Sequence, residues 1–276
     1  MNSSNAFTKD NPSLSNLGLK MYEVEFSLKK YVQSYWRIQC YLENKKSFKI
    51  APDGAMGLLI NLGDTLEIKT STHTYQVEKS QVVLLGIYEN PVYMEFENNC
   101  EVIGIRFNPA GASFFFSQYM HDLFENIITL TDTNIYESIL SNSNDLVNSL
   151  DTYLLKRFKK SNKAFDIMDI ITLIEKNSGS YDIEELILCA NMSRRNLDRV
   201  FKKALGLSLK VYARIIKIKY TRMSLQNYGF DTLTTVSYNS GYFDQSHFIK
   251  EFKNFMFETP KEYFQRKQKL SQKYNS

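Results

Sequence analysis

Charged side chains cluster at the start of a helix that the sequence predicts over residues 193–203. When the apolar residues of this helix turn inward, Arg194, Arg195, Asp198 and Arg199 remain on its outer face. A guanidinium fits the O6 and N7 acceptors of guanine with two hydrogen bonds, and a carboxylate can accept from cytosine N4. These residue types near the beginning of a short helix therefore predict contacts with base edges in a major groove.

A second helix with the same design is predicted over residues 244–253. Phe248 and Phe252 turn inward, and Gln245, Ser246 and Lys250 project outward. A glutamine side chain matches adenine N6 and N7, and serine can bond to either kind of base. We therefore assign base-facing roles to these three outward residues as well.

The basic residues around the two helices suit a phosphate backbone. Residues 1–160 contain 15 Lys and Arg against 18 Asp and Glu, a net charge of −3, whereas residues 161–276 contain 19 against 12, a net charge of +7. Between Arg194 and Arg222 there are ten cations and one acid. Such a local excess attracts nucleic acid. We expect phosphate contacts, which position the protein rather than select a sequence, from Lys202, Lys203, Lys210, Arg214 and Lys253.

A long helix separates the two reading helices. It is predicted from Ser208 to about Asn227, roughly 20 residues, and would be about 30 Å long at 1.5 Å per residue. One turn of B-DNA is about 34 Å. A stiff connection of this length could set both helices in successive major grooves, so that one chain reads an asymmetric site without a dimer.

The elements that must position these residues are all helical after Phe165. Helix-stop signals at Asn191 and Gly206, together with N-cap residues, divide the segment into seven helices. They contain two helix–turn–helix units, at about 182–203 and 232–253. The predicted N-caps are Asp182, Ser193, Ser208, Thr232, Asp244 and Thr259.

The first half of the chain has a different pattern. From about Tyr35 to Phe107, short apolar runs alternate with turn residues, which is typical of a β-sandwich or barrel. In one run, Ile103, Ile105 and Phe107 share one face. Helices follow after Pro109. We therefore predict an α+β protein with two domains, residues 1–160 and 161–276, joined by the polar segment 159–163.

The C-terminal hundred residues resemble the AraC/XylS family of bacterial transcription regulators. The resemblance implies base-reading roles for Arg195, Asp198 and Arg199 in the first unit and for Gln245, Ser246 and Lys250 in the second. It also implies double-stranded DNA and RNA polymerase as partners, and a cytoplasmic, nucleoid-associated protein. Two residues depart from the family pattern, Ile187 and Ser237, where small residues are usual. The matching segments are 193–203 with Gly206, and 241–253 with 259–263.

The N-terminal half resembles an uncharacterised, cupin-like sensor-type domain often fused to such DNA-binding units. The resemblance implies a small β-barrel or sandwich and leaves its effector open. Trp36 and Arg106 are the residues we consider as ligand contacts, although Trp36 also suits the core and Arg106 also suits a pair with a neighbouring acid. Asp53 precedes Gly54 and suits a turn. The matching segments are 34–36, 52–54, 59–64, 84–86 and 104–111.

Two apolar groups in this half bear on assembly. The aromatic run 114–116 fits packing. The stripe Leu146, Leu150 and Leu154 fits either a core or a dimer seam. We favour the seam, and with it a homodimer formed through the N-terminal domain.

Other functions lack support in the sequence. The cysteines and histidines are widely spaced, which predicts no metal or cofactor, and no nucleophile lies beside a base. No apolar run reaches the ~18–20 residues of a membrane span, and the polar residues 1–15 predict no secretory signal. We predict a sequence-specific transcription regulator that is not an enzyme and responds to a small effector. The alternative is a ligand-independent repressor or architectural protein whose N-terminal domain only dimerises.

Overall fold

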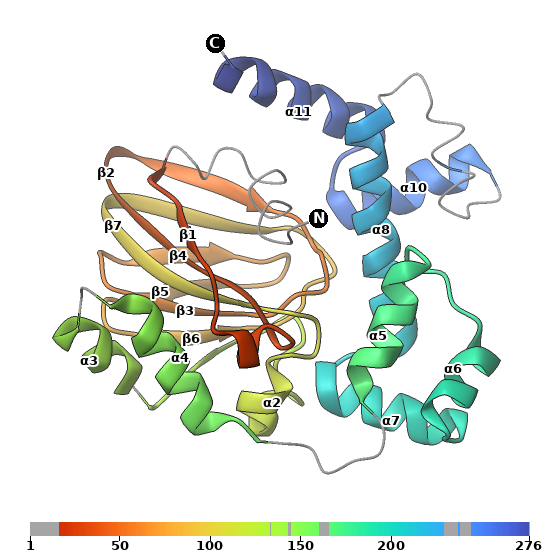
Figure 1. Cartoon of the computed structure of the whole chain (residues 1–276). Coiled ribbons are helices and arrows are strands. Elements are labelled where there is room, and N and C mark those ends of the chain that lie inside the picture. The colour runs from red at the N-terminus through yellow and green to blue at the C-terminus, as the bar shows by residue number, and fades with distance from the viewer. Residues whose placement is uncertain are drawn as a thin grey trace.

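The chain folds into a β-rich half followed by a helical half (Figure 1). The computed structural model describes residues 17–132, 134–142, 145–159, 166–228, 237 and 244–275. The predicted α+β class, with helices flanking an N-terminal sheet, is confirmed. Among the described residues, no helix is both long enough and apolar enough to cross a membrane.

The N-terminal half is built on one antiparallel sheet whose main path runs β1-β2-β7-β3-β6-β8. Strands β2 and β7 are much longer than the others, and β4 joins the sheet through β7 and carries β5. A shift of register between Leu42 and Lys46 marks a bulge in the long β2–β7 pair. Bulges increase local twist, which helps a long pair of strands to curve. The strands are β1 (Lys20–Tyr22), β2 (Val32–Ile50), β3 (Gly57–Asn61), β4 (Leu66–Lys69), β5 (Thr74–Val77), β6 (Val82–Leu85), β7 (Val92–Phe107) and β8 (Ile127–Thr129).

The sheet is buried on both faces. Ile103, Ile105 and Phe107 of β7 belong to one apolar cluster, as their spacing predicts. Val102 of the same strand belongs to the cluster on the opposite face, together with Trp36 of β2. Because alternate residues of a strand point to opposite sides, both faces need apolar side chains. This explains the near-continuous apolar runs of the short strands.

Helices cover the first of these faces: α2 (Ser113–Phe116), α3 (Asn134–Ser141) and α4 (Leu146–Arg157), of which α3 and α4 appear in green in Figure 1. Two further single turns, η2 (Phe26–Leu28) and η3 (Ser117–Tyr119), lie in the connections. Phe115 and Phe116 are buried, which confirms that the aromatic run packs inside.

The leucine stripe of α4 is core, and the dimer seam that we favoured for it is wrong. Leu146 is 7% exposed, and Leu150 and Leu154 are 0% exposed within the single chain. They belong to the same cluster as the sheet residues beneath them. Their side chains are therefore already used in packing α4 and are not presented to a second subunit.

The helical half follows its predicted caps closely. Asp182, Ser193 and Asp244 each accept a hydrogen bond from a backbone amide in the first turn of the helix they precede, and Asp166 does the same without having been predicted as a cap. At the last helix, Thr259 and Glu262 form a reciprocal capping box. The helices are α5 (Ile167–Lys176), α6 (Ile183–Ala190), α7 (Arg194–Leu205), α8 (Leu209–Tyr228), α10 (Gln245–Met256) and α11 (Pro260–Asn275).

The turn of the first helix–turn–helix unit has the predicted geometry. Asn191, after α6, adopts the left-handed conformation with φ of 49°, and Gly206 ends α7 with φ of 79°. Asparagine and glycine tolerate this region at low cost. The remaining predicted helix, the fifth in chain order, begins at Thr232 and lies outside the described residues, apart from the buried Ser237.

Candidate nucleic-acid interface and adjoining pocket

The charged face of α7 is open to solvent. Leu197 and Phe201 are fully buried, and Arg194, Arg195, Asp198 and Arg199 are exposed. Arg199 donates a hydrogen bond of 2.9 Å from Nη2 to the Asn196 side chain one turn earlier. The structure therefore exposes all four predicted base-facing residues of this helix, with Arg195 and Arg199 on the side opposite its core and Arg194 and Asp198 along one flank.

The second reading helix, α10, is arranged in the same way. Phe248 and Phe252 are buried against each other with ring centroids 5.8 Å apart. The three predicted base-facing residues are exposed: Gln245, Ser246 and Lys250.

Helix α8 lies between the two reading helices, with α7 beside its lower end and α10 beside its upper part in Figure 1. At 20 residues it spans about 30 Å. Its N-terminal turn and α7 form a surface hollow that brings several predicted contacts together, namely Arg194, Asp198, Lys202 and Lys210.

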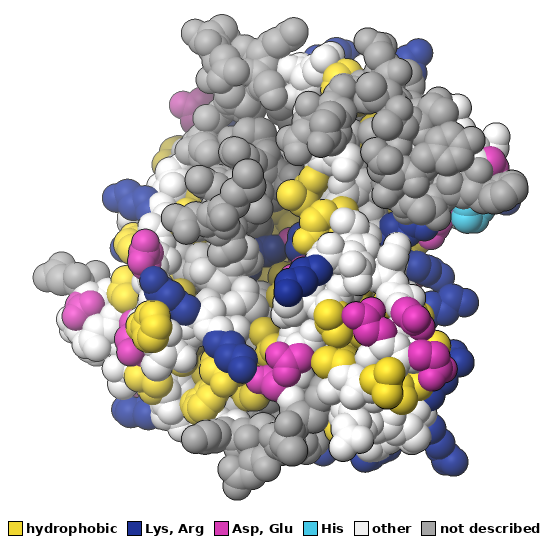
Figure 2. Space-filling view, turned by 45° about the vertical axis from the view of Figure 1, so that its right-hand side comes forward, with side chains coloured by type: hydrophobic (Ala, Val, Ile, Leu, Met, Phe, Trp, Pro, Cys, Tyr) yellow, Lys and Arg dark blue, Asp and Glu magenta, His cyan; other side chains and the backbone are white. Residues whose placement is uncertain are grey.

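The predicted phosphate contacts fall into two groups. Lys202, Lys203, Lys210 and Lys253 are exposed near the reading helices. Figure 2 shows Lys and Arg side chains along the right-hand edge of the molecule, on the helical half. Arg214 differs, because it forms an ion pair of 3.3 Å with Glu89 of the sheet half and lies over an aromatic ring of α10. The structure thus places Arg214 between the two halves of the chain.

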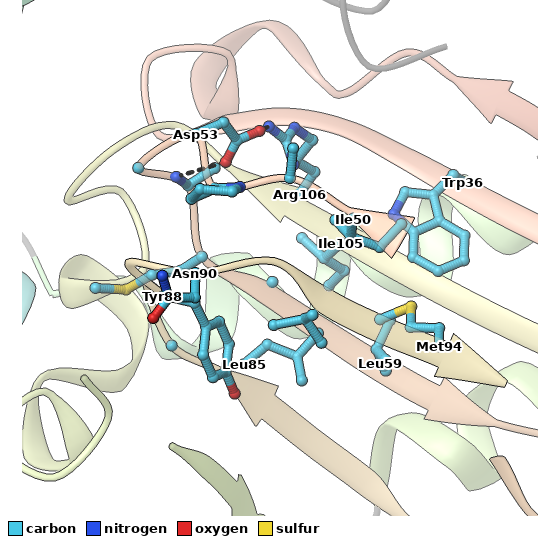
Figure 3. A pocket seen from close by; sticks show the side chains of 18 of the residues that line it. Trp36, Ile50, Asp53, Leu59, Leu85, Tyr88, Asn90, Met94, Ile105 and Arg106 are labelled. Atoms are coloured by element: carbon cyan, nitrogen blue, oxygen red, sulfur yellow. Dashed lines mark hydrogen bonds and ion pairs between the residues drawn. The ribbon is translucent and has the colours of Figure 1, made fainter. Parts of the chain in front are cut away.

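The two residues that we considered as ligand contacts line one cavity of the sheet half. Trp36 of β2 and Arg106 of β7 both border it, and its volume is about 870 Å³ with the open mouth included. In Figure 3, Asp53 and Arg106 lie on one side, Tyr88 and Asn90 lie opposite, and Trp36 lies further along the strands.

A partly buried ion pair lies on one side of the cavity mouth (Figure 3). The Arg106 guanidinium pairs with the Asp53 carboxylate, and Arg106 Nε donates to the Gln33 side chain at 2.6 Å. Burial by itself raises the pKa of Asp53, but the charges of Arg106 and Lys219 outweigh it, so the pKa lies below its usual value. Asp53 also accepts from the Ala55 amide, which is the predicted turn. Of the two roles left open for Arg106, the pair with a neighbouring acid is therefore present.

Trp36 owes its position to a glycine. Gly104 is its direct partner across the β2–β7 pair. A Cβ atom at Gly104 would lie 2.0–2.4 Å from atoms of the Trp36 indole ring, so only glycine leaves room for it. Trp36 is 7% exposed and belongs to the apolar cluster of this face, which makes it both a core residue and a cavity wall.

Two loops that border the cavity also contact the helical half. In the loop between β2 and β3, the Pro52 carbonyl accepts a hydrogen bond of 2.9 Å from Arg222 of α8. A Cβ atom at Gly54 would lie 2.8 Å from the Tyr212 ring, which shows how closely this loop meets α8. In the loop between β6 and β7, Asn90 donates to the carbonyls of residues 254 and 255 in α10.

A third link joins the end of β2 to the connection after α10. Lys49 donates to the Met256 carbonyl at 2.6 Å and to Glu258 at 2.7 Å, and Arg266 of α11 also holds Glu258. These residues are absent from our predicted site. Lys49 and Glu258 lie 209 positions apart, so no local pattern could pair them.

Comparison with known proteins matches two separate segments of the chain to two family models. Residues 188–266 match the family described as a helix-turn-helix domain, and residues 21–129 match a domain of unknown function (DUF6597). The C-terminal part of the chain therefore matches a helix-turn-helix domain. It is joined to an N-terminal domain that has its own family.

Similar proteins include two regulators. The chain is 30% identical over 91 residues to the HTH-type transcriptional regulator MtrA of Neisseria gonorrhoeae, covering 33% of this chain and 30% of MtrA. It is 26% identical over 94 residues to an uncharacterized HTH-type transcriptional regulator of Haemophilus influenzae, covering 34% and 31%. The chain thus spans less than a third of the length of these relatives. A structure of ToxT from Vibrio cholerae aligns with 89% of this chain and 97% of its own, at 13% identity and a TM-score of 0.45.

Proposed function

We propose that this protein is a sequence-specific DNA-binding transcription regulator that reads two successive major grooves with α7 and α10. In this proposal residues 161–276 bind DNA, and residues 1–160 modulate binding through a small effector. The observation that supports it most is the joint exposure of Arg195, Arg199 and Gln245 on two helices held by α8. Arginine and glutamine at such positions supply direct readout.

The base-facing and phosphate-facing roles within this proposal can be separated by mutation. Arg199→Ala should cost roughly 1–3 kcal/mol on a cognate duplex and relax selection at one base pair. Lys203→Ala should weaken binding to all duplexes alike and lower the salt slope by about one unit. Both can be measured by titrating duplexes from a selected pool at several salt concentrations.

The two variants also control for each other, because both remove an exposed cation from α7. If Arg199→Ala weakened every duplex equally, Arg199 would be a phosphate contact. If neither variant changed the affinity for any duplex, α7 would not be a reading helix. Failure of the wild-type protein to bind any duplex at low salt would refute the proposed function.

The cavity favours effector control over an N-terminal half that only dimerises. The cavity is lined mostly by apolar side chains with a few polar groups at its mouth, which is the composition of a small-molecule site. Its bordering loops contact α8 and α10, so a change there has a direct structural path to the reading helices. We place RNA polymerase contact and homodimer formation within this proposal as partners of the DNA-bound protein.

A further inference from the structure

The chemistry of the cavity wall limits what it can bind. Asp53 and Arg106 are the charged residues among those that line it, and they neutralise each other. An anionic ligand held by Arg106 would bring a second negative charge beside the Asp53 carboxylate. A cationic ligand held by Asp53 would bring a second positive charge beside the guanidinium. Either adds like-charge repulsion and desolvation at a partly buried pair, so the wall favours an uncharged ligand.

The polar side chains at the mouth already have partners. The Tyr88 hydroxyl donates to the Asn126 carbonyl at 2.9 Å, and the Asn90 amide is engaged with α10. Both are therefore less available to a ligand. The rest of the wall is mostly hydrocarbon and aromatic, from β2, β3, β6 and β7: Trp36, Ile38, Leu59, Leu85, Met94 and Phe96.

We propose that this cavity binds an uncharged, predominantly apolar small molecule, and that its occupancy reaches the reading helices through residues 51–56 and 86–91. The assignment rests on the proposed function, because it gives the effector a chemical class and its site a route to the helices proposed to bind DNA. The ligand gains affinity from apolar burial. Its lack of charge leaves the Asp53–Arg106 pair intact.

The path from the cavity to the reading helices runs through residues that border the cavity and also contact the helical half. Pro52 and Gly54 border the cavity and also contact α8, through Arg222 and Tyr212 respectively. Arg222 is 1% exposed and Tyr212 is fully buried, so neither can move independently of the loop. Since packed interiors transmit displacement, a ligand that shifts this loop changes the position of α8. Asn90 provides the equivalent contact to α10.

The first test uses Trp36, which is the only tryptophan of the chain and lines the cavity. Its fluorescence is titrated with N-phenyl-1-naphthylamine, which is neutral, and with 8-anilinonaphthalene-1-sulfonate, which adds a negative charge to the same ring system. We expect saturable quenching by the neutral probe and binding of the sulfonate weaker by about tenfold or more, because that charge has no free partner in the cavity. Equal or tighter binding of the sulfonate, or no quenching by either probe, would overturn the ligand class.

Two variants make the result specific to this cavity. Gly57→Leu directs a side chain into it, where a Cβ meets only ordinary contacts of 3.5 Å or more, and should abolish quenching by the neutral probe. Asp53→Asn leaves Arg106 without its carboxylate and should strengthen sulfonate binding by about tenfold while leaving the neutral probe little changed. An unchanged ratio of the two affinities in Asp53→Asn would contradict the argument from charge. Circular dichroism confirms that each variant is folded.

The second test concerns the route. Saturating neutral probe should change the affinity of the full chain for a selected duplex about threefold or more, since a ligand shifts an equilibrium when it prefers one state. The affinity of Gly57→Leu for the same duplex should not respond. Quenching without any change in DNA affinity would overturn the route. Absence of DNA binding altogether would refute the proposed function, whereas the fluorescence titration would still decide the ligand class.

Discussion

The link between Lys49 and Glu258 provides a direct test of how the two halves are joined. Lys49 is the second-to-last residue of β2, and its ammonium donates to the Met256 carbonyl and to the Glu258 carboxylate, at 2.6 and 2.7 Å. The Lys49 and Glu258 side chains are only 16% and 12% exposed. Replacing Lys49 with methionine keeps most of its length and removes both bonds.

The loss of unfolding free energy expected for Lys49→Met follows from opposing effects. Hydrogen bonds to charged groups contribute about 1.5–3 kcal/mol each. Burial lowers the pKa of Lys49, so removing the ammonium also relieves a desolvation penalty. Glu258 keeps two bonds from Arg266 and is not left unpaired. We therefore expect Lys49→Met to destabilise the protein by about 2 kcal/mol, and the Lys49→Met, Glu258→Gln cycle to give a coupling energy of about 1–2 kcal/mol.

Urea unfolding measures this with one probe in each half. Trp36 fluorescence follows the sheet half, and far-UV circular dichroism is dominated by the helices. Coincident transitions in the wild type should separate in Lys49→Met as the helical half loses its docking contact. Lys29→Met is the matched control, because Lys29 pairs with Glu23 at the surface, with the two side chains 52% and 87% exposed. Such pairs contribute little.

A coupling energy near zero would refute this reasoning. So would the same loss in Lys29→Met as in Lys49→Met, since the effect would then not come from the buried link. Either result would show that the two halves do not pack in solution as the structure places them.

Three further predictions concern single residues. Tyr212→Phe should leave the protein as stable or raise its free energy of unfolding by up to about 1 kcal/mol, because the buried hydroxyl has no hydrogen-bond partner among the described residues; a loss above that size in urea unfolding would contradict this. Gly104→Ala should destabilise by about 1–3 kcal/mol and change the emission of Trp36, since the added methyl overlaps the indole; unchanged emission would show that the ring is placed elsewhere. The pKa of Glu258 is held below its usual value, because bonds from Arg266 and Lys49 outweigh burial, which raises it. Its contribution is therefore complete above the pKa of an unfolded glutamate and is lost as pH falls below about 4. Glu258→Gln should flatten the decline of unfolding free energy between pH 6 and pH 3 in calorimetry, and an equally steep decline would assign it to other carboxylates.

The helical half was predictable because its signals are local. Caps such as Ser193 and Asp244 lie within one turn of the amides they satisfy, and Asn191 sets its turn by its own conformational preference. The reading faces follow from apolar residues at helical spacing. The structure extends α7 and α10 by two and three residues beyond the predicted ends, to Leu205 and Met256, as is usual where helix ends are set by the C-cap.

The cavity was predictable only in part. Trp36 and Arg106 stand out by residue type, but their convergence depends on the register of β2 against β7. The role of Arg106 depends on its ion pair with Asp53, which lies 53 positions away in the sequence. For the stripe that contains Leu150, the periodicity shows an apolar face without showing what covers it, so core and seam look alike.

The contacts between the halves had no signal in the sequence. Arg222 and Pro52 lie 170 positions apart, and the bond uses a backbone carbonyl that any residue would supply. Arg214 illustrates the consequence. It reads as one more cation of a basic stretch, yet Glu89 and an aromatic ring of α10 hold it between the halves.

Hydroxyl-radical footprinting on a selected duplex tests most directly whether α7 and α10 bind neighbouring major grooves together. The spacing set by α8 predicts two protected blocks on one face of the duplex, about one helical turn apart. Inserting 5 base pairs, about half a turn, between the blocks should abolish tight binding, because it rotates one groove to the opposite face. A single protected block, or binding unaffected by the insertion, would contradict reading by both helices of one chain.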